Sequence, residues 1–164
     1  MYMEKLFLCY AEAFRNMKRA AVRGYTAPHK PVLLLSVMQL AEEGIITTNQ
    51  IKLDEELIKK FAWIWSQYVD DGGHREKMMV ADGLELEIVR KYPFKCSIAN
   101  PFFHMQSEPF WRLVKSDAYV KRPDYSVKGL QTCFEYAEID EDLFSLFEDA
   151  EAREMFRNVL ANMI

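Results

Sequence analysis

The chain has 164 residues, of which 50% are hydrophobic and 13% aromatic, so it can fill one core without disulfides or metal. Its net charge of -4 is unevenly spread: residues 130–164 contain nine acids and two arginines, which leaves +3 on residues 1–129. No apolar run approaches the roughly 20 residues that cross a bilayer, so we expect no contact with a membrane, and a mildly basic body able to hold phosphate.

Two helices are predicted in the first quarter of the chain. Apolar residues recur at intervals of three and four over residues 3–23, which predicts an N-terminal helix that Gly24 ends. A turn over residues 25–28 follows. A second helix begins near Pro31, where a missing N–H costs nothing, and stops at Gly44. Because this helix is apolar on most of its circumference, we expect it at the centre of the core.

A short strand over residues 50–53 and a third helix are predicted next. Asp54 is placed to cap this helix, which runs through Tyr68 and breaks at residues 70–73. Alternating apolar residues around 84–88 weakly favour another strand. Residues 102–106 and 110–114 are rich in β-formers and flank Ser107-Glu108-Pro109, which predicts a hairpin.

The end of the chain predicts a helix over 126–133, an extended piece over 134–138, and helices over 140–147 and 149–162. The fold class is therefore α+β and mainly helical. We expect a single domain over residues 1–164, with five to six helices and a small antiparallel hairpin or sheet.

No motif for catalysis occurs. The sequence lacks Cys-x-x-Cys, His-x-His, Gly-x-Ser-x-Gly and phosphate-loop patterns, so we expect no enzyme activity, no cofactor and no metal. A nuclease assembled from scattered acids stays open as an alternative. The three cysteines, Cys9, Cys96 and Cys133, share no close spacing, which indicates reduced thiols and a cytoplasmic protein.

Three stretches resemble a known family. The turn Pro28-His29-Lys30-Pro31 leading into an apolar helix, and the stretch from Asn100 to Trp111, resemble the sulfur-binding domain of phosphorothioate-dependent, HNH-type restriction endonucleases. Residues 139–147, followed by an arginine-containing apolar helix, resemble the end of that domain. That family carries a Tyr-Pro-Phe-Trp-x-Leu-Gln-Asn-Asp-Gly-x-Trp hairpin. The likeness spans residues 26–163, with residues 1–25 as an additional N-terminal helix, and the nuclease domain of the family is not recognised.

The resemblance implies a double-stranded DNA-binding module of a restriction or defence system, with cleavage left to a separate nuclease subunit. Its ligand is DNA in which sulfur replaces a non-bridging phosphate oxygen. The sulfur pocket maps onto Asn100, Pro101, Phe102 and His104. DNA contacts map onto His29 and Lys30. The family's usual tyrosine before the proline is here Asn100, which leaves another DNA modification, or unmodified DNA, open as the ligand; Tyr92-Pro93-Phe94 is interpreted as a decoy for that motif.

Further phosphate contacts are predicted from charge. The candidates are Arg19, Arg23, His74, Arg75, Lys121 and Arg122, the last two just before a helix N-terminus that favours anions. The predicted site residues also have structural interpretations. His29 can hydrogen-bond the start of its helix, and Pro101 and Phe102 can belong to the core of the hairpin. The lysines and arginines can simply be solvated. A protein-interaction module without DNA binding, docked through its methionine-rich acidic C-terminal helices, is the alternative function.

Overall fold

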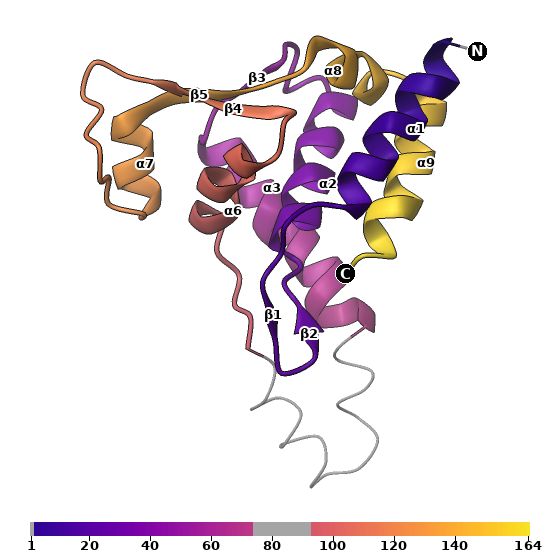
Figure 1. Cartoon of the computed structure of the whole chain (residues 1–164), viewed down its shortest axis with the longest axis horizontal. Coiled ribbons are helices and arrows are strands. Elements are labelled where there is room, and N and C mark those ends of the chain that lie inside the picture. The colour runs from indigo at the N-terminus through magenta and orange to yellow at the C-terminus, as the bar shows by residue number, and fades with distance from the viewer. Residues whose placement is uncertain (1, 74–92) are drawn as a thin grey trace, which may run out of the picture.

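The structure is a computed structural model that describes residues 2–73 and 93–164, and its centre is helix α2, His29–Glu42 (Figure 1). Ten residues of α2 are buried. Gly44, with φ of +75°, follows in the left-handed conformation that commonly ends a helix. Helices α3 (Glu55–Trp65), α8 (Glu141–Phe147) and α9 (Ala150–Ala161) pack against α2, so the predicted central helix is confirmed.

The N-terminal helix belongs to the same core. Helix α1 (Tyr2–Arg15) packs against α8 and α9, and Ala11, Phe14 and Met17 are buried in the core cluster. The Phe14 ring lies 5.3 Å from that of Phe110 and 5.1 Å from that of Phe156, measured between centroids. Residues from both ends of the chain therefore share one core.

The predicted helix over residues 3–23 is too long. The structure ends α1 at Arg15 and forms a hairpin from β1 (Ala21–Val22) and β2 (Tyr25–Thr26). The Lys18 N–H, which would continue the helix, donates instead to the Glu108 carboxylate at 3.0 Å. The hairpin turn consists of Arg23 and Gly24, both with positive φ, as a two-residue turn between twisted strands requires.

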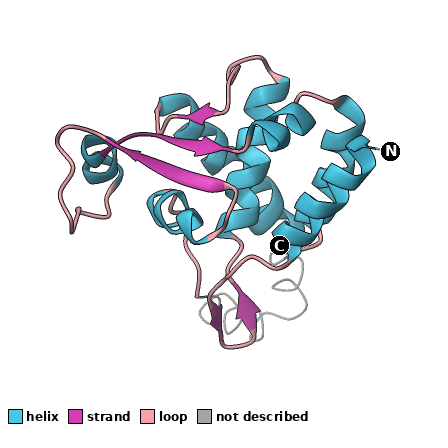
Figure 2. Ribbon diagram, turned by 45° about the horizontal axis from the view of Figure 1, so that its top comes forward, coloured by secondary structure: helices cyan, strands magenta, loops and turns pink. Residues whose placement is uncertain are grey.

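Three strands form an antiparallel sheet beside the helices (Figure 2). Strand β5 (Phe134–Ile139) lies between β3 (Gln50–Ile51) and β4 (Trp111–Lys115). Trp111 pairs with Ile139, and Ile51 with Ala137.

The predicted hairpin over residues 102–114 is wrong in its first half. Residues Ala99–His104 form helix α6 and Met105–Ser107 a 3-10 turn, η2, while β4 pairs with β5. Buried Ile98, Phe102 and Met105 recur every three to four residues, so a helix buries all three on one face where a strand would not. Because aromatic residues are also common in strands, the sequence pattern favoured a strand over this helical spacing.

The remaining predicted elements are found close to their expected places. Asp54 caps α3 by accepting from the Leu57 N–H, and Asp149 and Ser126 cap α9 and α7 (Val127–Cys133) in the same way. Helix α3 continues as a π-helix, η1, over Ser66–Gly73. Seven α-helices and two small antiparallel sheets in residues 2–73 and 93–164 confirm the α+β, mainly helical class. This is one helix more than the five to six predicted, because α6 replaces a predicted strand. The strand predicted near residues 84–88 lies outside the described residues.

Candidate nucleic-acid interface

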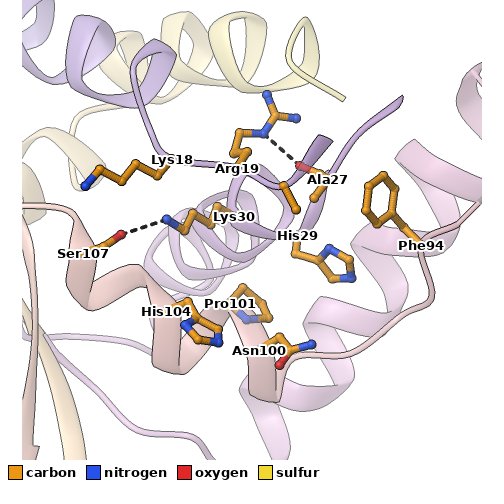
Figure 3. Close-up of a pocket in the computed structure, with 11 residues that line it drawn as sticks. Lys18, Arg19, Ala27, His29, Lys30, Phe94, Asn100, Pro101, His104 and Ser107 are labelled. Atoms are coloured by element: carbon orange, nitrogen blue, oxygen red, sulfur yellow. Dashed lines mark hydrogen bonds between the residues drawn. The ribbon is translucent and has the colours of Figure 1, made fainter. Parts of the chain in front are cut away.

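A pocket of about 520 Å³ lies where three separate segments meet (Figure 3). The linker after α1 contributes Lys18, Arg19 and Ala20; the start of α2 contributes His29 and Lys30; and α6 with η2 contributes Asn100, Pro101, His104 and Ser107. Ala27 and Phe94 complete the lining. The first two segments of the family resemblance, some 70 residues apart, therefore line one pocket, whereas residues 139–147 do not.

His29 serves a structural purpose as well as lining the pocket. Its Nε2 lies 2.8 Å from the Lys95 carbonyl oxygen, and because a carbonyl only accepts, Nε2 must carry the proton. The imidazole packs against the rings of Trp65 and Phe94 at 4.8 and 5.9 Å. This burial lowers the pKa of His29 below its ordinary value, so the neutral ring is favoured.

Lys30 forms a buried ion pair beside the pocket. Its Nζ donates to Glu108 Oε2 at 2.7 Å and to Ser107 Oγ at 3.1 Å, and both charged side chains are less than 10% exposed. The same Oε2 accepts from the Lys18 N–H at 3.0 Å. One carboxylate oxygen thus joins the α1 linker, the start of α2 and the turn before β4.

Helix α6 supplies the wall opposite α2. Asn100 and His104 are exposed, whereas Pro101 is buried and still lines the pocket, so its ring is an apolar wall rather than a free surface. Figure 3 shows these three side chains across the pocket from His29 and Lys30.

Phe102 does not line the pocket, contrary to the sequence expectation. It is 1% exposed and lies against Trp111, with ring centroids 5.5 Å apart at 88°. The Trp111 indole N–H donates to the Phe102 carbonyl at 3.1 Å. Phe102 therefore belongs to the core, whereas its neighbour Pro101 lines the pocket. Phe102 holds α6 against the core.

The other predicted cations are dispersed. Arg19 lines the pocket, and its Nε donates to the Ala27 carbonyl at 2.8 Å. Arg23 lies in the β1–β2 turn and is exposed. Lys121 and Arg122 are exposed in the loop between β4 and α7, and neither lines the pocket. His74 and Arg75 lie outside the described residues.

The helix that follows Lys121 and Arg122 is a poor anion site. Helix α7 has seven residues, and the Ser126 hydroxyl already accepts from the Gly129 N–H. The same hydroxyl donates to the Asp124 carboxylate at 2.9 Å, which puts a negative charge at this end. The N-terminus of α7 therefore gives no support to the predicted phosphate contacts at Lys121 and Arg122.

Sequence reasoning did not predict several residues of this arrangement, among them Lys18, Phe94, Ser107 and Glu108. Phe94, interpreted as part of a decoy motif, lines the pocket, as does Ser107. Glu108 was assigned only to a turn. A carboxylate flanked closely by the apolar residues Met105 and Phe110 is a signal for a buried acid, and it could have indicated a cationic partner.

The pocket lining contains three cationic side chains, two histidines and no carboxylate. It can therefore hold an anion near donors from the linker and α2, with carbon of Pro101 and Phe94 also in the lining. No group of three or more potential metal ligands occurs in residues 2–73 and 93–164. Within those same ranges, no helix has both the length and the apolarity to cross a bilayer.

No protein-family model matches the chain, and no curated protein is significantly similar to it.

Proposed function

We propose that the protein binds the DNA backbone and that its pocket receives a phosphate in which sulfur replaces a non-bridging oxygen. The observation that carries this proposal is the convergence of cations, proline and aromatic carbon in one pocket free of lining carboxylates. Cleavage then belongs to a separate nuclease subunit. A role on DNA with free thiols fits the cytoplasm.

The two ligands differ in hydration. A phosphorothioate keeps the negative charge of a phosphate but presents a large, polarisable sulfur that water solvates poorly. Moving a phosphate oxygen against Pro101 and Phe94 sacrifices strong hydration, whereas moving a sulfur there costs less. Lys18, Arg19 and Lys30 supply donors for the remaining oxygen and for neighbouring phosphates. Asn100, in place of the family's tyrosine, adds an amide to the same wall.

Stereochemically defined duplexes test the proposal. The two non-bridging positions of a phosphate point in different directions, so one pocket accepts sulfur from only one diastereomer. We expect that diastereomer to bind about 10- to 200-fold more tightly than the oxygen duplex, the range typical of one apolar group in a fitted pocket. Fluorescence anisotropy at fixed salt measures all three affinities.

Two variants distinguish recognition of sulfur in the pocket from nonspecific binding by cations on the surface. Pro101→Ala removes ring carbon from the pocket wall and should reduce the preference for sulfur. Lys121→Ala removes an exposed cation outside the pocket and should weaken sulfur and oxygen duplexes equally, if it weakens them at all. Equal binding of all duplexes by the wild type contradicts the proposal for sulfur. Absence of DNA binding at low salt leaves the protein-interaction alternative.

A further inference from the structure

We infer that Glu108 sets the anion selectivity of the pocket by neutralising Lys30. This inference rests on the proposed function and deepens it, because it identifies what keeps ordinary phosphate from binding well. Glu108 does not line the pocket itself, but it contacts three residues that do: Lys18, Lys30 and Ser107.

The geometry makes Lys30 a polar donor with little net charge. Lys30 Nζ and Glu108 Oε2 are 2.7 Å apart with both side chains buried, so the pair acts on the pocket largely as a dipole. The described residues engage two of the three N–H donors of Lys30, at Glu108 and Ser107. One donor remains for an incoming anion, without a full uncompensated charge behind it.

Such a pair affects the two ligands differently. A hard, localised charge on phosphate oxygen gains more from a bare ammonium than a diffuse charge on sulfur does. An unpaired Lys30 would therefore favour ordinary phosphate more than phosphorothioate. Neutralised by Glu108, Lys30 leaves the discrimination to the carbon of Pro101 and Phe94 in the pocket lining.

The arrangement also has a structural role, which the test must separate from selectivity. Glu108 joins the α1 linker, α2 and the turn before β4, so its removal can move the pocket walls. Movement alone would lower affinity for both duplexes. An unmasked charge instead raises affinity for the oxygen duplex and steepens the salt dependence, because each additional phosphate neutralised adds about 0.9 to the slope of log K against log salt.

The experiment compares Glu108→Gln with the wild type on sulfur and oxygen duplexes at salt concentrations between about 50 and 200 mM. We expect a slope steeper by about 0.9, which is an additional loss of about 3.5-fold across that range. We also expect a smaller ratio of sulfur to oxygen affinity. Glu148→Gln, which removes an exposed acid that does not line the pocket, is the matched control and should change neither quantity.

The double variant Lys30→Met/Glu108→Gln removes both charges and should return the slope to the wild-type value. If Glu108→Gln does not fold, Lys30→Met is compared with the double variant. Lys30→Met alone leaves the carboxylate uncompensated and should be shallower in slope by about 0.9. Equal slopes in that comparison overturn the inference.

The two proposals fail in distinguishable ways. A wild-type protein that prefers sulfur, with Glu108→Gln unchanged in slope and ratio, refutes the role of Glu108 alone. A wild-type protein that binds both duplexes equally refutes sulfur recognition. A wild-type protein that binds no DNA refutes the proposed function, and the inference with it.

Discussion

Replacing Phe102 by alanine tests whether this residue belongs to the core or to the pocket. The ring is 1% exposed and contacts Trp111 edge to face, with centroids 5.5 Å apart. Truncating a fully buried phenylalanine costs about 3–5 kcal/mol of unfolding free energy, because the lost transfer energy is joined by the cost of a cavity. Domains of this kind are stable by about 5–15 kcal/mol, so Phe102→Ala should be severely destabilised.

Urea unfolding followed by tryptophan fluorescence measures this cost as a shift in midpoint at constant slope. Phe102→Leu keeps most of the apolar volume and should lose only about 1–2 kcal/mol. We expect the leucine variant to fold, so its preference for sulfur over oxygen duplexes can be measured, and it should equal that of the wild type. An alanine variant of nearly wild-type stability that has lost the sulfur preference would refute the assignment of Phe102 to the core.

Three further predictions concern other contacts. Burial lowers the pKa of His29, so the unfolded chain binds the proton more tightly than the folded chain does. The free energy of unfolding should therefore fall as pH drops below 6.5, by up to about 1.4 kcal/mol per pH unit. Thermal unfolding of His29→Gln, which keeps a hydrogen-bond donor, should show a weaker pH dependence. Tyr10→Phe removes a 2.7 Å hydrogen bond to Asp140 between α1 and the start of α8, and urea unfolding should show a loss of about 1 kcal/mol; an unchanged midpoint would contradict this tether. Gly129→Ala would place a Cβ 2.2 Å from the Asp124 carbonyl oxygen, and differential scanning calorimetry should show a loss of about 1–3 kcal/mol, with wild-type stability as the contrary result.

Local signals in the sequence predicted much of the fold. Asp54 caps its helix where expected because capping depends on the neighbouring N–H groups alone. The burial of α2 follows from its apolar circumference, and Gly44 ends that helix where expected. These features need no knowledge of distant residues.

The errors arise where distant residues decide the outcome. Helix α1 ends earlier than predicted because the Lys18 N–H donates to the carboxylate of Glu108, which lies 90 residues further along the chain. No local sequence pattern indicates that partner. Residues 99–104 form a helix because a helix buries both Phe102 and Met105 against neighbours from elsewhere in the chain, whereas a strand would turn them to opposite faces. Tertiary packing overrides β-propensity at that point.

Several residues of the candidate site were predictable from the sequence, but the contacts between them were not. The resemblance brought attention to His29, Lys30 and Pro101, and the structure places all three around one pocket. The buried pairing of Lys30 with Glu108 required coordinates, because it joins residues 78 positions apart. That pairing changes Lys30 from a free cation into a neutralised donor.

The ratio of wild-type dissociation constants for an oxygen duplex and its sulfur twin, measured across ionic strengths, tests the central claim most directly. Both duplexes carry the same charge, so each affinity should fall with added salt while their ratio stays constant at about 10 or more. A ratio near one at every salt concentration would show that the pocket beside Pro101 does not recognise sulfur.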